Sequence, residues 1–219
     1  MKIEAFSKTY QGRVVLQFPG GEFLPGTVYA VLGHNGCGKS TFASVISGII
    51  PSDQGLPVLA PIKTGYLPQH PYAFHRSVRK NLLLNGEGND AIKKERAAKL
   101  MDALSLNILS SKNAASLSGG ETAKMALARL LMKHYDLLIL DEPCAAMDMH
   151  SIRQAEELIR EYVEETGCLL FLITHSFRQA ERLSDEVLFL HEGCLLERGK
   201  TDQVLHHSQH AKVREFLEF

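Results

Sequence analysis

Four short apolar runs recur along the chain, and none of them alternates apolar with polar residues. They span residues 28–33, 136–142, 168–175 and 186–193. Unbroken apolar runs of this length are typical of strands buried on both faces of a parallel sheet. Between the second and third runs, apolar residues recur at helical spacing in "SIRQAEELIREYVEE", from Ile152 to Val163. The order strand, helix, strand predicts an α/β fold with a mostly parallel sheet.

Two other stretches have different patterns. In residues 1–27, "IEAFSKTY" and "RVVLQF" precede a glycine- and proline-containing segment, which predicts a small N-terminal antiparallel β lobe. Residues 90–133 contain two helical stretches, "DAIKKERAAKLMDALSL" and "SLSGGETAKMALARLL", and no convincing strand. We therefore expect one domain over residues 1–219, with an α-helical lobe at about residues 72–134 inserted into the α/β core.

Composition narrows the function classes. Lys plus Arg number 24 and Asp plus Glu 25, giving a net charge of −1, so the broad basic field of a nucleic-acid-binding protein is absent from the sequence. The N-terminus turns polar at once, and no apolar run approaches the roughly 18 residues of a membrane helix. The four cysteines form no CxxC pair, which favours reduced thiols over a zinc site or disulfides. We expect a soluble protein that does not bind nucleic acid.

The segment "GHNGCGKST" fits the pattern G-x-x-x-x-G-K-[ST] and lies between a predicted strand and a predicted helix. Its glycines allow the backbone N–H groups to face a phosphate, Lys39 can reach the β- and γ-phosphates, and the Ser40 hydroxyl can hold Mg²⁺. The rival interpretation, a glycine-rich turn of a dinucleotide-binding fold, does not account for Lys39 and Ser40 together. The positions predicted to bind nucleotide are Gly33, His34, Asn35, Gly36, Cys37, Gly38, Lys39, Ser40 and Thr41.

Polar residues follow three other predicted strands. The run 136–142 ends in two carboxylates, where Asp141 would contact Mg²⁺ and Glu142 would polarise the attacking water. His175 follows another apolar run, and Gln69 ends a possible strand as an uncharged group able to reach both metal and water. Alternatively, the two acids are a solvated strand end and His175 is structural.

A second helix opening also suits an anion. In "SLSGGETAKMALARLL", Ser118 is placed to cap the helix, and Glu121 stands three residues later in capping-box position. Free backbone N–H groups and the positive end of the helix dipole gather at such an opening. The chain therefore contains two predicted phosphate-binding segments, or phosphate cradles, at residues 33–41 and 117–121, although one nucleotide needs only the first.

Taken in order, these stretches resemble the ATP-binding cassette (ABC) ATPases, from Tyr10 to about Gly199. The matching segments are the phosphate loop at 33–41, Gln69, "LSGGE" at 117–121, "LLILDEP" at 137–143, "AAMD" at 145–148 and "TH" at 174–175. "LSGGE" is the most specific of them, because it is the signature of that family. The resemblance implies a P-loop NTPase core, ATP hydrolysis, and ATP and Mg²⁺ as ligands.

The resemblance also implies roles for single residues. Two cassettes pair head to tail in this family, so Ser118, Gly119, Gly120 and Glu121 would bind the ATP held by a partner subunit. Tyr10 would stack on adenine, Asp148 would lie at the dimer seam, and His175 would hold the γ-phosphate and orient Glu142. Gln69 would couple nucleotide and metal to a membrane partner, and the segment "HPYAFHRSVRKNLLLN" would help to form that partner's docking groove. Tyr72, Phe74 and Val78 of this segment are alternatively core residues.

Some positions depart from the family pattern. Cys144 stands where Thr or Ser is usual, and Ala123 and Lys124 replace the more typical Gln and Arg after the signature. Lys124 keeps the charge but loses the bidentate geometry of arginine. The segment 42–68 is short, which predicts a trimmed antiparallel lobe. None of these changes removes a catalytic group, so we expect hydrolysis to be retained.

The resemblance places the chain among energy-coupling subunits of membrane transporters. Its end, "TDQVLHHSQHAKVREFLEF", is similar to those of bacterial importers of small polar solutes, such as amino acids or oxyanions including tungstate. The implied partners are a second cassette, in a homodimer or a heterodimer, an integral membrane permease and, indirectly, an external solute-binding protein. The implied location is peripheral, on the cytoplasmic face of the cell membrane. Two alternatives remain: a soluble ABC ATPase acting on a macromolecular assembly, and a small-molecule kinase.

Overall fold

The computed structural model describes residues 1–57 and 61–217, which form two compact units. The first unit comprises Met1–Tyr66, Asp136–Asp141 and Gly167–Phe219. The second comprises Leu67–Tyr135 and Glu142–Thr166. The second unit contains the helical lobe predicted at about 72–134, together with a further segment after Asp141.

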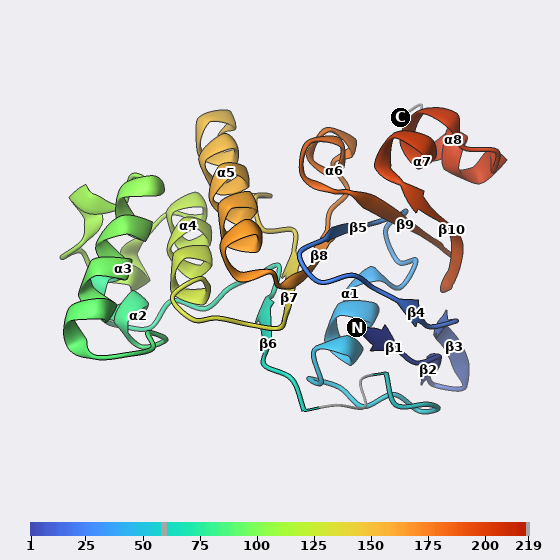
Figure 1. Ribbon diagram of the computed structural model, residues 1–219, viewed down its shortest axis with the longest axis horizontal. Helices are drawn as coiled ribbons and strands as arrows, with labels where there is room; N and C mark the ends of the chain where they lie inside the picture. Colours follow the sequence, from blue (N-terminus) through green and yellow to red (C-terminus); the bar gives the residue numbers. More distant parts are fainter. Residues whose placement is uncertain (58–60, 218–219) are drawn as a thin grey trace. The chain divides into compact units, whose positions relative to one another are not determined.

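The first unit is built around a sheet. Its strands are β1 (Lys2–Ile3), β2 (Phe6–Tyr10), β3 (Arg13–Phe18), β4 (Gly21–Glu22), β5 (Val28–Leu32), β6 (Thr64–Leu67), β7 (Leu137–Asp141), β8 (Leu169–Ile173), β9 (Glu186–His191) and β10 (Cys194–Lys200). Eight of them form one sheet in the order β2-β3-β10-β9-β5-β8-β7-β6, while β1 and β4 pair separately. Its helices are α1 (Lys39–Ile46), α6 (Phe177–Leu183), α7 (Thr201–His207) and α8 (Ala211–Leu217) (Figure 1).

The central strands confirm the prediction from the apolar runs. β5 pairs in parallel with both β8 and β9, and β7 pairs in parallel with β8. In β5, Tyr29 and Val31 belong to a core cluster that includes Phe42 of α1. Ala30 and Leu32 belong to a second cluster that includes residues of α6, α7 and α8. Both faces of the strand are therefore buried, which is why its sequence shows no alternation.

The N-terminal strands agree with the predicted antiparallel pattern. β2 pairs antiparallel with β3, and β1 pairs antiparallel with β4. However, β2 and β3 are joined to the main sheet, because β3 pairs in parallel with β10 at Gln17 and Cys194. The antiparallel lobe is thus partly an extension of the large sheet.

Helices make up the second unit. They are α2 (Val78–Leu83), α3 (Asp90–Ala103), the 3₁₀ turns η1 (Asn107–Leu109) and η2 (Ala114–Ser116), α4 (Gly119–Leu130) and α5 (Met149–Thr166). The side chains of Ser77, Asn89 and Ser118 cap α2, α3 and α4. Contacts join α4 to α2, α3 and α5, so the signature helix lies at the centre of this unit.

The structure corrects one strand boundary and adds elements that the sequence pattern did not reveal. β6 ends at Leu67, so Gln69 lies in the following loop and does not end the strand. The added elements are β10, α2, α6 and α7, all of them short or polar. In residues 1–57 and 61–217, no helix combines the length and the apolar character needed to cross a bilayer.

Candidate nucleotide-binding site

The phosphate loop lies at the carboxyl end of β5 and leads into α1. Gly33 has φ 144, and a Cβ atom there would lie 2.1 Å from the carbonyl oxygen of Leu190, so no larger residue fits. Gly38 also has a positive φ, 105, at the N-cap of α1. The backbone N–H of Gly193 donates to the Cys37 carbonyl at 3.1 Å. Backbone groups of β9 and of the turn that follows it therefore support the phosphate loop.

Lys39 is buried and is already positioned by the loop. Its ammonium donates to the carbonyl oxygens of Gly33 at 2.7 Å and His34 at 2.9 Å. These bonds hold the Lys39 amine inside the turn of the loop. Phosphate oxygens of a bound nucleotide can therefore replace the two carbonyl acceptors with little change in the conformation of the lysine.

The Ser40 hydroxyl and the Asp141 carboxylate are hydrogen-bonded to each other, so two hard oxygen donors lie together. Burial raises the pKa of Asp141 above its ordinary value of 3.8, while a hydrogen bond from Ser40, another from Tyr66 and the charge of Lys39 act in the opposite direction. The Tyr66 hydroxyl lies 3.4 Å from Asp141 Oδ2. A buried carboxylate that remains poorly compensated, next to a hydroxyl, suits Mg²⁺, which prefers oxygen ligands. The donor set therefore fits the implied metal ion.

His175 lies at the same edge of the sheet as the phosphate loop and Asp141. The parallel registers pair Val31 with Ile173 and Asp141 with Ile173. β8 ends at Ile173, two residues before the exposed His175. Because the carboxyl ends of parallel strands form the binding edge of an open α/β sheet, this placement fits the predicted contact with the terminal phosphate.

Asp141→Asn is expected to stabilise the metal-free protein by about 2–4 °C in Tm while reducing hydrolysis, because it removes a buried charge and keeps an acceptor oxygen. A carboxyl group with a raised pKa stabilises the fold at low pH and loses that contribution as pH rises through the folded pKa. The gain in Tm should therefore grow with pH above the ordinary value of 3.8. Thermal unfolding in a chelator at several pH values measures it.

The matched control is Asp136→Asn at the other, exposed end of the same segment, where the carboxylate accepts the Lys63 backbone N–H at 2.8 Å. That variant should not gain stability. A lower Tm for Asp141→Asn at neutral pH would contradict the prediction, because it would show that the buried carboxylate stabilises the metal-free protein.

Tyr10 ends β2 with 47% of its surface exposed. The Lys8 ammonium lies 5.4 Å from the ring centroid, and it also pairs with Asp53 Oδ1 at 2.8 Å. Asp53 in addition accepts the Thr9 backbone N–H at 2.6 Å. The cation–π contact and this ion pair fix the tyrosine ring at the end of the strand, which suits stacking on a nucleobase.

The signature segment opens α4 with the predicted capping box. Ser118 Oγ accepts the Glu121 backbone N–H, and the Glu121 carboxylate accepts the Ser118 backbone N–H at 2.8 Å. Gly119 is exposed, and a Cβ atom there would meet only the Ala146 side chain at 3.7 Å. At Gly120 a Cβ atom would lie 2.7 Å from the Ala146 carbonyl oxygen. The segment is thus a rigid, accessible helix opening.

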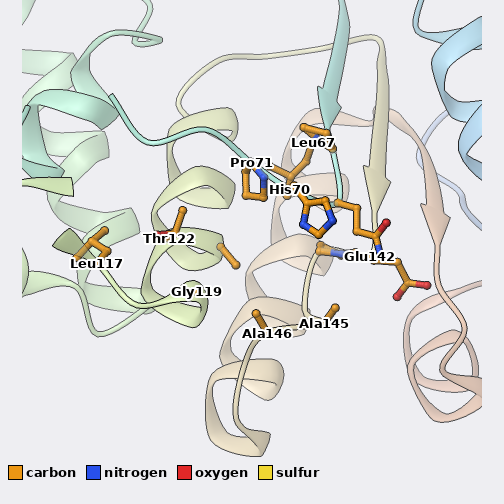
Figure 2. Close-up of a pocket in the computed structure, with 13 residues that line it drawn as sticks. Leu67, His70, Pro71, Leu117, Gly119, Thr122, Glu142, Ala145 and Ala146 are labelled. Atoms are coloured by element: carbon orange, nitrogen blue, oxygen red, sulfur yellow. The ribbon is translucent and has the colours of Figure 1, made fainter. Parts of the chain in front are cut away.

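Glu142 and Gln69 line one pocket within the second unit, of about 370 Å³. Glu142 has φ 51, an uncommon conformation for a residue other than glycine, and this turn separates it from the buried Asp141. Figure 2 shows side chains from the start of α4 and from the loop before α5 around the same pocket. The lining residues are Leu67, Pro68, Gln69, His70, Pro71, Leu117, Gly119, Thr122, Ala123, Glu142, Pro143, Ala145 and Ala146.

The Asp148 side chain forms hydrogen bonds at the start of α5. Its carboxylate accepts the Ser151 backbone N–H at 2.9 Å and the Ser151 hydroxyl at 3.0 Å, and these bonds lower its pKa. It therefore caps the start of α5. The residue remains exposed, so this bonding is compatible with the predicted place at a dimer seam.

The segment after Gln69 contains both exposed and core residues. Tyr72 and Phe74 are 62% and 44% exposed, whereas Val78 is fully buried and is a core residue. Arg129 of α4 donates to the Tyr72 carbonyl at 2.7 Å and lies over the Phe74 ring at 5.0 Å. Asn81, also fully buried, accepts the Phe74 backbone N–H and donates back to its carbonyl.

Asn81 and Arg129 were missed in the sequence, because each has partners that only the fold brings close. Arg129 donates to the Asn81 side chain, 48 residues away, and to the Tyr72 carbonyl, 57 residues away. Together they tie the exposed aromatic residues to the helix that begins at the signature.

Across the described ranges 1–57 and 61–217, no group of three or more His, Cys, Asp or Glu side chains could hold a metal ion. His206 and His207 of α7 instead pair with Glu181 and Asp202. None of the four cysteines, all of which lie in the described ranges, forms a disulfide, and burial raises the pKa of Cys37 in the phosphate loop.

Comparison with known proteins agrees with this geometry. The sequence model of the ABC transporter family matches residues 20–145. The zinc import ATP-binding protein ZnuC of Halorhodospira halophila is 31% identical over 218 residues, covering 97% of this chain and 82% of that protein. The tungstate uptake system ATP-binding protein TupC of Peptoclostridium acidaminophilum is 34% identical over 204 residues, covering 87% of this chain and 94% of that protein.

A solved structure of an ATP-binding subunit of an ABC transporter has the same fold. It matches with a TM-score of 0.88 over 100% of this chain and 99% of that chain, at 22% identity. The predicted P-loop α/β fold is confirmed by this match.

Proposed function

The chain belongs to the ABC transporter family, and on that premise we propose that it is the ATP-hydrolysing, energy-coupling subunit of a membrane importer for a small polar solute. ATP binding and hydrolysis are the family's activity. The relatives described above carry import or uptake in their names, which supports import over export for this chain. The two units act together as one nucleotide-binding domain in this proposal.

One observation carries the proposal: the chain has a phosphate loop and, separately, a rigid helix N-terminus at the signature segment. Lys39 is positioned in the first, and the capping box fixes Ser118 in the second. A single enzyme that bound one nucleotide would not need both. A head-to-tail dimer does, because the signature of each subunit then completes the ATP site of the other.

The catalytic step follows from the residues at these two places. Glu142 directs water in line at the γ-phosphorus, while Lys39, His175 and the partner's signature N–H groups offset the developing negative charge. Mg²⁺, held by Ser40 and Asp141 with Gln69 as a further ligand, would supply additional charge neutralisation on the phosphates. Tyr10 stacks on the adenine ring. Loss of the shared γ-phosphate weakens the dimer, and reopening becomes motion in an attached protein.

The attached protein in this proposal is an integral membrane permease. Peripheral attachment to it places the chain at the cytoplasmic face of the membrane, and an external binding protein would deliver the solute. Gln69 and the exposed aromatic residues Tyr72 and Phe74 are the proposed points of coupling. The clamp formed by Arg129 and Asn81 supports this, because it connects those aromatic residues to the signature helix.

The solute is proposed only by class, as an amino acid or an oxyanion such as tungstate. A tungstate relative supports the oxyanion, and the zinc relative shows that the family also includes metal importers. The permease and the binding protein contact the solute, so their identity decides between these classes.

Affinity purification of the tagged chain from gently solubilised membranes of its native cells tests the proposal. We expect an integral membrane protein at near-equal stoichiometry, and we expect Lys39→Met to abolish solute uptake while preserving the complex. Recovery with soluble partners alone, such as a ribosome or a repair complex, would overturn the transporter proposal and favour the soluble ATPase alternative. Transfer of the γ-phosphate to a small-molecule acceptor would instead favour a kinase.

A further inference from the structure

The C-terminal helix α8 contacts the phosphate loop through one aromatic side chain. The Phe216 ring lies 5.0 Å from the His34 ring, at an interplanar angle of 88°. The same ring packs on Phe189 of β9 at 5.2 Å. Phe189 is paired in the sheet with Leu32, the residue immediately before the loop. Phe216 therefore joins the base of the loop to its first exposed residue.

Helix α8 is itself firmly anchored to the sheet. Val213 is fully buried in the cluster that contains Leu32 and Phe189. Arg214 donates to the Ser208 carbonyl at 3.0 Å, and the buried Ser208 donates its hydroxyl to Glu197 of β10. Phe216 is thus presented by a fixed element.

Neighbouring backbone also lies against other parts of the loop. The Gly193 N–H donates to the Cys37 carbonyl at 3.1 Å. A Cβ atom added at Gly33 would lie 2.1 Å from the Leu190 carbonyl oxygen, and one at Gly38 would lie 3.1 Å from the Val15 carbonyl oxygen. His34 extends outward and is exposed, yet its carbonyl is one of the two that hold the Lys39 ammonium. The His34 side chain is accordingly the point at which a contact can fix this part of the loop.

We propose that Phe216 is a positioning residue, which holds His34 and so preorganises the first turn of the phosphate loop for a nucleoside triphosphate. A loop that is already ordered loses less conformational freedom when the ligand binds, which lowers the dissociation constant. The contact does not involve the reacting atoms, so it aids the ground state and the transition state equally. Such uniform binding changes KM and leaves kcat unchanged. This inference depends on ATP binding at the loop and is independent of any transport partner.

The test compares Phe216→Leu with a matched control, Phe177→Leu. Phe177 packs against the same apolar cluster and also contacts a histidine edge to face, His206 at 5.6 Å and 89°. That pair does not involve the phosphate loop. The measurements are the Kd of a fluorescent ATP analogue with Mg²⁺, KM and kcat for ATP hydrolysis, and Tm for each variant.

We expect Phe216→Leu to raise Kd and KM about threefold to tenfold, with kcat at saturation within about twofold of the wild type. Phe177→Leu should leave Kd unchanged, and Phe216→Tyr, which keeps the ring, should restore it. His34→Ala should raise Kd similarly, and the double variant His34→Ala/Phe216→Leu should be no weaker than either single variant.

An unchanged Kd in Phe216→Leu, or an equal rise in Phe177→Leu, would overturn the inference, because the helix would then only stabilise the fold. Additive effects in the double variant would also overturn it. Absence of ATP binding by the wild-type protein would be a failure of the proposed function itself, which distinguishes the two.

Discussion

Glu142→Gln is expected to reduce ATP hydrolysis roughly 10²- to 10³-fold while leaving ATP binding intact. Gln has the shape of Glu but cannot accept a proton from water or polarise it as strongly. Asp141, Ser40 and Lys39 remain in place in this variant, so the phosphates and the metal ion are still bound. Because the γ-phosphate is no longer cleaved, the closed head-to-tail dimer should accumulate in ATP and Mg²⁺.

Steady-state hydrolysis, the Kd of a fluorescent ATP analogue and size-exclusion chromatography with light scattering measure the three parts of this prediction. Glu165→Gln is the matched control, because it makes the same change in the same unit and removes only the exposed pair with Lys99. That variant should hydrolyse ATP normally. Retention of wild-type turnover by Glu142→Gln would exclude Glu142 as the residue that activates water. A monomer in saturating ATP, also after addition of the co-purified permease, would contradict the closed dimer.

The fold could be predicted largely because its central strands are buried on both faces. β5, β7, β8 and β9 each appear in the sequence as an unbroken apolar run, and long helices such as α5 show a clear 3.6-residue period. β10 could not be predicted in this way. Its side chains are half-buried or exposed, and the strand is held by backbone pairing with β9 on one side and with β3 on the other.

The phosphate loop could be predicted because its chemistry is local. Glycines, Lys39 and Ser40 act within nine consecutive residues, and the capping box of α4 spans only Ser118 to Glu121. By contrast, the contact of Phe216 with His34 and the clamp of Arg129 on Tyr72 join residues far apart in the chain. Neither pair leaves a pattern in the sequence, since the geometry of the folded sheet and helices brings them together.

Asp148 shows the limit of carrying roles over by resemblance. The resemblance assigns it to a dimer seam, yet the structure first shows a helix cap bonded to Ser151. A substitution at Asp148 would therefore alter α5 as well as any dimer. Residues whose side chains are not needed for the fold give clearer tests of the dimer, and Gly119 is such a residue.

Two inactive variants are expected to restore hydrolysis when they are mixed, if each ATP site is shared between two subunits. Lys39→Met disables the phosphate loop and keeps most of the side-chain volume. Gly119→Asp disables the signature, because a carboxylate at the helix opening repels the γ-phosphate of the partner's ATP. The fold tolerates this change, since a Cβ atom at Gly119 makes only an ordinary contact and an acidic residue suits the first turn of a helix.

Each variant alone should fall to a few per cent of wild-type activity or less, on the order of the loss of a single electrostatic group. In an equimolar mixture, half of the dimers contain both variants, and each of these has one complete site, with the phosphate loop from one subunit and the signature from the other. About one quarter of wild-type activity should return, as the symmetry of a head-to-tail dimer requires. A mixture of wild type with Lys39→Met shows whether one complete site is sufficient. If it is, and the two variants still fail to complement, the signature does not act on the partner's nucleotide, and the second phosphate cradle of this chain would need another explanation.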